Sequence, residues 1–435
     1  MWKAPALALV LTLCACATGE GLAVSDSKYT PVRFGVIGDQ TGTEDLDGAY
    51  RTLQAGVTAL NLESVELVIH TGDLIESTKP ESEVRVDWAR ARAILSGLSA
   101  PWMLAPGDHD VNPPGWVTGS SDRSREALFM SLYGDHAPDA REALWQVRDV
   151  RGVRFIALNS HEALHADPRW GNTFMASISA SQRAWLAQAL DAKPTPRAIV
   201  VFLHQPLWYS WAAWVPVHHL LRSRGVDLVI GGHFHYGQDE GELDGVRYIV
   251  VGATGGMTKH GSANAGARHH VSVIEVGADN VSIRVLPLAP EPATVTLAPR
   301  RDMDRVQAVS SMLWSAQRGG RTDALQGDCT GIASLGNPID VPLRLSVITS
   351  HSIPIPGRFA AGFCDPGAGE CVVAPVTGVQ SSNLSTVSLV QTRSPVWKSA
   401  APLSSVNVEA SFEGEAGPYT LRQAIKAVRF ACGPP

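Results

Sequence analysis

The sequence predicts an α/β domain followed by a smaller β-rich domain, and three observations support this. Over residues 32–290, short apolar runs typical of buried strands alternate with apolar residues at helical spacing. After Pro287 the chain becomes rich in Pro, Thr and Val, and short alternating segments follow from Leu343. The chain of 435 residues also exceeds the length of about 250–300 residues at which single cores usually stop growing. We therefore expect a second domain over residues 291–435.

The first residues are typical of an export signal. Lys3 precedes the apolar run Ala4–Leu13, which is too short to span a bilayer as a helix. The residues that end this run, up to Cys16, resemble the lipobox of bacterial lipoproteins. We predict a signal peptide with a lipobox over residues 1–16 and a tether over residues 17–31. The protein is then exported to the periplasm or cell surface and anchored to a membrane through lipidated Cys16, unless the segment is an ordinary cleaved signal.

Seven apolar runs predict the buried strands of the first domain. They are Arg33–Ile37, Leu67–His70, Trp102–Ala105, Val153–Leu158, Ala198–Leu203, Asp227–Ile230 and Tyr248–Val251. Apolar residues at spacings of three and four predict helices over Leu46–Leu60 and Val84–Leu98. Ser179 and Gln182 have the spacing of a capping box and predict the start of a third helix.

Five short polar motifs each follow one of these strands. They are Gly38-Asp39-Gln40-Thr41, Gly72-Asp73-Leu74-Ile75-Glu76, Gly107-Asp108-His109-Asp110, Leu203-His204-Gln205-Pro206 and Gly232-His233-Phe234-His235. A single Gly-Asp pair is a common turn, but five ordered motifs at strand ends are not expected by chance. Ligands of α/β folds bind beyond the carboxyl ends of the strands. Carboxylates and imidazoles bind Zn, Mn and Fe, so the motifs predict a metal site at that edge.

The ordered set resembles the calcineurin-like metallophosphoesterase superfamily, whose pattern is Asp-x-His, Gly-Asp-x-x, Gly-Asn-His-Asp/Glu, His and Gly-His-x-His. The resemblance covers roughly residues 32–290 and implies a β-sandwich flanked by helices, with two divalent or mixed-valence metal ions (Mn, Fe or Zn) at the strand ends. It implies that Asp39 and His235 hold one metal and that Asp73 bridges both. It gives the second metal three further ligands, Asp108, His204 and His233.

The same resemblance implies hydrolysis of a phosphate ester. Two cations about 3.5–4 Å apart can share a hydroxide and clamp a phosphate oxygen, so the nucleophile needs no side chain. His109 stands where the family has the histidine that protonates the leaving group, with Asp110 orienting it. The substrate is then a phosphate ester of unspecified class.

The sequence departs from the family pattern at two positions. Thr41 replaces the usual histidine on the first metal, and its hydroxyl is a poor ligand. In the purple acid phosphatase branch that histidine is also absent, and a tyrosine three residues after the second-motif aspartate replaces it. Glu76 occupies this position and is a possible metal ligand, or else a solvated residue at a helix start. Asp108 stands where the family has asparagine, which adds negative charge facing the phosphate.

Two other functions stay open at this point. One is a non-catalytic, metal-loaded surface lipoprotein that binds a partner, and the other is a single-metal hydrolase that uses only the second site. A nucleic-acid partner is not expected, because the net charge is −6 and no Lys/Arg cluster is present. The sequence does not indicate an oligomeric state.

Several further residues carry weaker predictions. His70 is expected to be buried and hydrogen-bonded, and His218 to belong to a helix. The aromatic stretch Trp208–Trp214 either lines a cleft near His204 or packs in the core. His269 and His270 follow a Gly-rich loop that can approach the site.

The last quarter of the chain predicts one helix, Met303–Gln317, and a disulfide-bearing β domain. Its expected strands are Leu345–Val347, Cys371–Val373 and Thr386–Gln391. An oxidising compartment makes two disulfides the expected state of four cysteines, Cys329, Cys364, Cys371 and Cys432. The turn-rich loop between Cys364 and Cys371 favours that pairing over a cysteine zinc site.

Overall fold

The computed structural model describes residues 30–115, 124–134, 136–137, 144–167, 173–209, 211–258, 266–278, 280–288, 297–318, 328–335, 337–348, 387–392, 405–426 and 428–431. The predicted signal peptide with its lipidated Cys16 and the predicted pairing of Cys364 with Cys371 lie outside these residues. Among the helices of the described ranges, none combines the length and the apolar character needed to cross a membrane.

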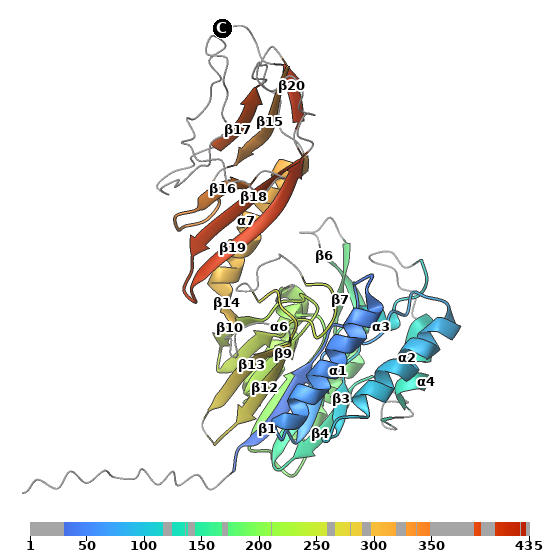
Figure 1. Cartoon of the computed structure of the whole chain (residues 1–435). Helices are drawn as coiled ribbons and strands as arrows, with labels where there is room; N and C mark the ends of the chain where they lie inside the picture. The colour runs from blue at the N-terminus through green and yellow to red at the C-terminus, as the bar shows by residue number, and fades with distance from the viewer. Residues whose placement is uncertain are drawn as a thin grey trace, which may run out of the picture.

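Two sheets face each other in the first domain (Figure 1). The five-stranded sheet has the order β13 (Val281–Pro287), β12 (His270–Val276), β1 (Val32–Ile37), β2 (Leu67–His70) and β3 (Trp102–Leu104). The seven-stranded sheet has the order β14 (Ala298–Pro299), β10 (Gln238–Leu243), β11 (Val246–Val250), β9 (Leu228–Gly231), β8 (Ala198–Phe202), β5 (Val153–Ala157) and β4 (Gln146–Val150). A β-hairpin, β6 (Ala163–Asp167) with β7 (Thr173–Ser177), stands apart from both sheets.

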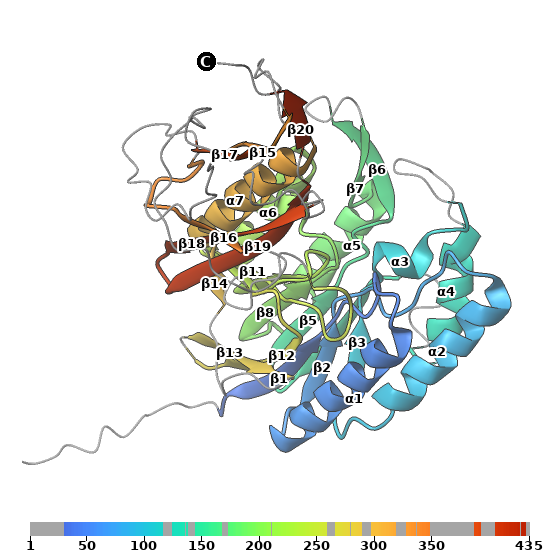
Figure 2. The ribbon, with the colours of Figure 1, turned by 45° about the horizontal axis from the view of Figure 1, so that its top comes forward.

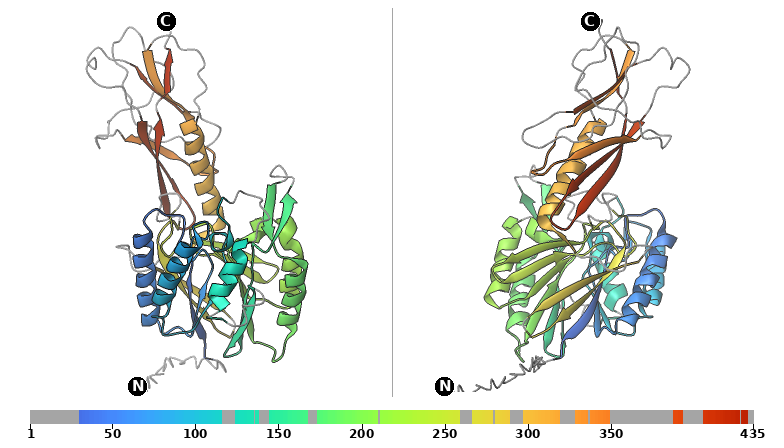
Figure 3. Two further views of the ribbon diagram at one scale, coloured as in Figure 1. Left: turned by 90° about the vertical axis from the view of Figure 1, so that its right-hand side faces the viewer. Right: turned by 60° about the vertical axis from the view of Figure 1, so that its left-hand side comes forward.

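Helices cover both outer faces, so the domain has four layers (Figure 3). The five-stranded sheet packs against α1 (Leu46–Leu62), α2 (Glu81–Leu95) and α4 (Ser124–Gly134). The seven-stranded sheet packs against α5 (Ala180–Asp191) and α6 (Trp211–Ser223), with the short η3 (Leu207–Tyr209) before α6. The inner faces of the two sheets share a third apolar core, in which Phe34 and Phe155 meet edge to face at 4.9 Å. The predicted helix-flanked β-sandwich is confirmed.

Local sequence explains where the helices begin. The side chain of Asp45 accepts a hydrogen bond from Gly48 N and caps α1. At α5 the Ser179 side chain accepts from Gln182 N, as the capping box predicts, but the Gln182 side chain does not return to Ser179. It instead spans to the loop after β5, where its Oε1 accepts from Asn159 N at 2.8 Å and its Nε2 donates to Asn159 O at 3.0 Å.

The polar motifs meet because the strands before them run parallel. β1, β2 and β3 are parallel neighbours in one sheet, and β8 and β9 are parallel neighbours in the other. Their carboxyl ends therefore lie at one end of the sandwich. The short helix α3 (Asp108–Val111) begins within the third motif.

The C-terminal module rises from that end of the sandwich (Figures 1 and 2). We use this name for α7 (Arg300–Arg318) with two three-stranded sheets. One sheet has the order β16 (Arg344–Ile348), β18 (Ser405–Glu413) and β19 (Pro418–Lys426), and the other has the order β17 (Val387–Thr392), β15 (Asp328–Leu335) and β20 (Val428–Ala431). The β-rich character of this region is confirmed. β14, which lies beyond the predicted boundary at residue 290, pairs with β10 of the first domain.

Candidate metal centre

Four of the predicted ligands have a backbone conformation that side chains rarely adopt. The φ angles are 56° at Asp39, 59° at Asp73, 69° at His233 and 59° at His235. Such a left-handed residue costs about 1–3 kcal/mol and persists only where its surroundings enforce it. Asp and His tolerate this conformation better than most residues. The concentration of strain at the strand ends points to a functional site.

Gly72 shows how tightly the loops pack at this point. It has a φ of 107°, and a Cβ here would lie 2.7 Å from Gly107 N and 2.8 Å from His204 Nδ1. Gly72 O also accepts a hydrogen bond from Asp39 N at 2.9 Å. Glycine at this position therefore lets three of the motifs approach one another.

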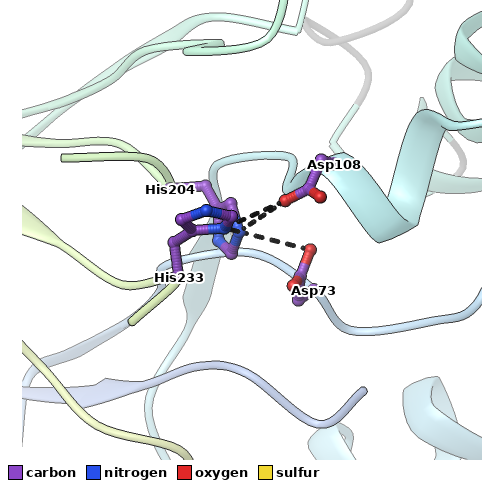
Figure 4. A group of neighbouring side chains, drawn as sticks. All are labelled: Asp73, Asp108, His204 and His233. Atoms are coloured by element: carbon purple, nitrogen blue, oxygen red, sulfur yellow. Dashed lines mark hydrogen bonds and ion pairs between the residues drawn. The ribbon is translucent and has the colours of Figure 1, made fainter. Parts of the chain in front are cut away.

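One group of four side chains comes from four different strand ends (Figure 4). Its members are Asp73, Asp108, His204 and His233, and one ligand atom from each lies within 4.8 Å of all the others. Nε2 of His204 lies 3.0 Å from Asp108 Oδ1 and 3.3 Å from Asp73 Oδ1. Nδ1 of His233 lies 3.2 Å from the same Asp108 oxygen. The imidazoles approach from one side and the carboxylates from the other.

A second group shares Asp73 with the first. Asp39, Asp73 and His235 also place one ligand atom each within 4.8 Å of one another, and all three are buried. Nε2 of His235 lies 3.6 Å from Asp39 Oδ1. Asp73 thus stands between the two groups, which is the bridging position that the resemblance implies.

Hydrogen bonds fix the orientation of two of the imidazoles. Nδ1 of His204 lies 2.9 Å from the carbonyl oxygen of Thr71, and Nδ1 of His235 contacts that of Met257. A carbonyl oxygen only accepts, so Nδ1 must carry the proton in both rings. Each Nε2 is then free to act as a ligand, and this arrangement is typical of metal-binding histidines.

The residues present fit a cation. Nε2 of His204 faces the buried carboxylate of Asp73, and Nε2 of His235 faces that of Asp39. Oδ2 of Asp39 is buried and has no hydrogen-bond partner in the described part of the chain. Burying an unpaired carboxylate is costly unless a positive charge compensates it. Oxygen and nitrogen ligands of this kind suit Mn, Fe or Zn.

The pKa values of Asp39 and Asp108 reflect the many ionisable side chains that are buried together at this site. Burial raises the pKa of the Asp39 carboxyl. At Asp108 burial also raises the pKa, but the charges and hydrogen bonds of His233 and His204 outweigh it and hold the pKa well below its usual range. Asp108 is therefore held ionised, whereas Asp39 needs a further positive charge beside it to be ionised as readily.

His109 is held by a residue other than the predicted one. Its Nδ1 lies 2.6 Å from Glu76 Oε2, and its backbone N donates to Asp73 Oδ1 at 3.0 Å. Burial lowers the pKa of His109, but the hydrogen bond to Glu76 and the charges of Asp73 and Asp108 outweigh it and raise the pKa to about 10. The imidazole is about one-third exposed, with a side-chain accessibility of 35%.

Asp110 has a structural task instead. It is buried, and its two oxygens accept four backbone N–H groups, those of Asp73, Leu74, Ile75 and Gly107. The prediction that Asp110 orients His109 is therefore wrong, because Asp110 accepts these backbone hydrogen bonds and Glu76 contacts the His109 ring. Asp110 binds the second motif to the third, because a carboxylate can satisfy several donors of two adjacent loops at once.

Both predictions for Glu76 also need correction. Glu76 belongs to neither group of metal-ligating side chains in the described residues. It is not a solvated residue at a helix start either, since α2 begins at Glu81 and the Glu76 side chain is 22% exposed. Its other oxygen accepts from Thr78 Oγ1 at 2.5 Å. Thr41, which replaces the expected histidine, donates to Asp73 Oδ2 at 3.3 Å.

Several supporting residues were not predicted from the sequence. Gln40 donates to the carbonyl oxygens of Gly38 and Thr254, and its Oε1 lies 2.7 Å from His70 Nε2. His70 is buried and hydrogen-bonded as expected, and burial lowers its pKa to about 3. The apolar run before His70 was the signal for its burial, but nothing local in the sequence indicates its bond to Gln40.

The remaining predictions near the site have clear outcomes. Trp214 is fully buried in the core of the seven-stranded sheet, while His218 lies in α6 and bonds to Tyr248. Nε2 of His269 lies 2.7 Å from Gly256 O, and His270 is buried. The two histidines thus fix the Gly-rich loop.

The fold and the two ligand groups are those expected of a metal-dependent phosphoesterase domain. A family model described as calcineurin-like phosphoesterase matches residues 32–237. Residues 32–237 therefore match the calcineurin-like phosphoesterase family, which the motifs also resemble.

Solved structures with a similar fold include phosphatases. The purple acid phosphatase PPD1 of yellow lupin is 16% identical, with 64% of this chain and 56% of that chain covered and a TM-score of 0.46. A dimetal phosphatase from Danio rerio is 18% identical, with 62% and 100% covered and a TM-score of 0.44. GAP50, the anchor in the inner membrane complex of Plasmodium, is 16% identical, with 62% and 89% covered and a TM-score of 0.41. No curated protein matches the chain.

Proposed function

We propose that the protein hydrolyses phosphate esters at a centre of two metal ions. The observation that carries this proposal is the sharing of Asp73 between two groups of ligand atoms, each within 4.8 Å. Asp108, His204 and His233 complete one group, and Asp39 and His235 complete the other. Two cations bound there would lower the pKa of bound water toward about 7 and offset the charge of the phosphate.

His109 supplies the proton for the leaving group in this proposal. Nδ1 is engaged by Glu76, and Nε2 makes no hydrogen bond to the described residues. The ring is partly exposed beside the ligand Asp108, which precedes it in the chain. The Glu76 carboxylate on Nδ1 favours the protonated ring, so that Nε2–H can donate to an alkoxide as the ester bond breaks. Glu76 holds the ring in the orientation that this donation needs.

Metal analysis combined with an activity screen tests the proposal. The full chain is loaded with Mn²⁺, Fe²⁺ or Zn²⁺ and assayed with chromogenic phosphomonoesters and phosphodiesters. We expect about two metals per chain and turnover that is lost in Asp73→Ala. A chain that binds no metal and cleaves no ester would overturn the proposal.

A single-metal hydrolase is a second candidate, which one observation favours. The group around Asp108 has four members and the group around Asp39 has three, because Thr41 replaces a histidine and bonds to Asp73 instead. One metal per chain with full turnover in Asp39→Asn would support this candidate. One metal without turnover would favour a metal-loaded surface protein that binds a partner.

We also propose that the protein is exported and anchored through Cys16. The support is the sequence alone, an apolar run followed by Leu13-Cys14-Ala15-Cys16. Fractionation of expressing cells tests this, with the wild-type chain expected in the membrane fraction. A Cys16→Ser chain should lose that location, whereas Cys14→Ser serves as the matched control and should keep it.

A further inference from the structure

The loop that supplies two of the metal ligands has a second, apolar side. His233 and His235 contribute to different ligand groups, and they alternate with Phe234 and Tyr236. Tyr236 is 2% exposed and belongs to an apolar cluster formed mainly by α7, β18 and β19. Phe234 packs against the same cluster. The ligands therefore share a short loop with residues that anchor it to the C-terminal module.

Aromatic contacts and one hydrogen bond make up this anchor. The rings of Phe234 and Tyr236 are stacked with centroids 5.4 Å apart, and Tyr209 meets Phe234 edge to face at 4.9 Å. Nε2 of Gln307, in α7, donates to the hydroxyl of Tyr236 at 2.7 Å. The loop is thus fixed from both sides, by η3 and by α7.

Helix α7 is itself held firmly in the C-terminal module. The carboxylate of Asp302 is fully buried and accepts from Glu415 N and Ala416 N, both at 2.9 Å. Nη1 of Arg305 donates to the same carboxylate at 2.9 Å, and its Nε donates to Asp340 at 2.7 Å. The loop between β18 and β19 is therefore joined to the helix that contacts Tyr236.

We propose that the C-terminal module positions the metal ligands through α7. Tyr236 and Gln307 are positioning residues, because they belong to neither ligand group and act through the backbone of the loop. The inference rests on the proposed metal centre and assigns a role to residues 300–318 in that centre. His233 and His235 both have positive φ angles, which need enforcement by neighbours. The packing of Phe234 and Tyr236 between η3 and α7 enforces these two φ angles.

Because the two histidines belong to different groups, loosening the loop should weaken both metal sites together. Residues that support metal ligands typically change metal affinity about 10–100-fold when substituted. We expect Gln307→Ala and Tyr236→Phe, which remove only the hydrogen bond, to lower the affinity about 10-fold. Tyr236→Leu removes the stacked ring as well and should approach a loss of about 100-fold.

Calorimetric titration of the metal-free full chain with Mn²⁺ measures these affinities and the number of sites. The matched control is Phe412→Leu, in β18, since Phe412 belongs to the same apolar cluster but stacks on Tyr419 at 5.2 Å rather than on the loop. The thermal midpoint of each metal-free variant is recorded alongside. The expected result is weaker binding in the Tyr236 and Gln307 variants, with Phe412→Leu lowering the midpoint about as much as Tyr236→Leu but binding Mn²⁺ normally.

Two results would overturn the inference, and they differ from failure of the metal centre itself. Wild-type affinity in Gln307→Ala and both Tyr236 variants would show that the module does not position the loop. An equal loss of affinity in Phe412→Leu would show that any loosening of the cluster has the same effect. If the wild-type chain binds no Mn²⁺, Fe²⁺ or Zn²⁺, the proposed function fails first.

Discussion

Oε2 of Glu76 lies 2.6 Å from Nδ1 of His109, and this pair joins the second motif to the third. Nε2 of the same ring makes no hydrogen bond to the described residues. The contact gives Glu76 a role that neither a metal ligand nor a solvated surface residue would have. The arrangement leads to a prediction about the leaving group.

We expect His109→Ala to lower kcat at least about 10²-fold, the usual lower limit for general acid catalysis. Glu76→Gln should lower it less, because the amide can still accept from Nδ1–H. Both losses should be larger for an alkyl phosphate than for a nitrophenyl phosphate, since a nitrophenolate leaves without a proton. Steady-state kinetics with the two esters measure this difference.

Metal content provides the control for that experiment. Both variants should retain the wild-type amount of metal, because neither residue belongs to the ligand groups. Equal losses with the two esters would contradict a proton-donating His109. Loss of metal in Glu76→Gln would restore Glu76 as a candidate ligand.

Gly72→Ala should disrupt the centre through the backbone. The added Cβ would lie 2.7 Å from Gly107 N and 2.9 Å from Ala105 O, at a φ of 107°. We expect a loss of about 1–3 kcal/mol in the free energy of unfolding, together with weaker metal binding. Chemical denaturation and metal titration measure the two effects.

Gly225→Ala is the matched control for Gly72→Ala. Gly225 also has a positive φ, 64°, but a Cβ there meets nothing within 4 Å. Gly225→Ala should lower the free energy of unfolding by about 1 kcal/mol and leave metal binding unchanged. Similar behaviour of the two variants would show that close approach of the loops at Gly72 is unimportant.

Asp302 should make the C-terminal module sensitive to acid. Burial raises the pKa of its carboxyl, but hydrogen bonds from Ala416 and Glu415 outweigh it and lower the pKa below the ordinary value of 3.8. Because the folded-state pKa is depressed, the stabilisation is fully present above the ordinary value of 3.8. It is lost as the pH falls through the folded-state pKa. Protonation then weakens the hydrogen bonds that the carboxylate accepts from Glu415 N, Ala416 N and Arg305 Nη1.

Unfolding measured at pH 7 and at pH 3 tests this with Asp302→Asn. At pH 7 the variant should lose about 1–3 kcal/mol, since it leaves a buried donor unsatisfied. The difference between the wild type and the variant should shrink at pH 3. A constant difference at both pH values would mean that Asp302 is not the titrating group.

Trp214→Ala distinguishes the two predictions for the aromatic stretch. Trp214 is 0% exposed, and its Nε1 donates to Tyr248 OH at 3.2 Å. Removing it should cost about 3–5 kcal/mol in the free energy of unfolding. In folded protein at low temperature, kcat/KM should stay at the wild-type value, whereas a residue that lines a substrate cleft would change it.

The strand ends are where sequence prediction was most successful. Leu67–His70 matches β2, and the other six predicted strands overlap β1, β3, β5, β8, β9 and β11. These strands are buried on both faces, so each is a continuous apolar run that the sequence shows directly. Edge and hairpin strands such as β4 and β10 expose polar residues and gave no such pattern.

The ligand groups were predictable for a different reason. Each candidate ligand follows a parallel strand by one or a few residues, which predicts a site at the strand ends. The resemblance to the phosphoesterase family then implied that Asp73, Asp108 and His204 hold the same metal. The contacts of long side chains were not predictable in this way. Asp110 and Glu76 are both acidic and close to His109, and only their positions in space show which of them contacts the ring.

The sequence by itself determined the class of domain, the strand ends and the identity of the candidate ligands, because these depend on local patterns and on their order along the chain. Only the tertiary structure decided that Glu76 rather than Asp110 holds His109, and that α7 contacts the loop of His233 and His235. Such contacts join residues that lie about 30 to 70 positions apart in the chain. They result from the packing of whole layers, which no local pattern of residues encodes.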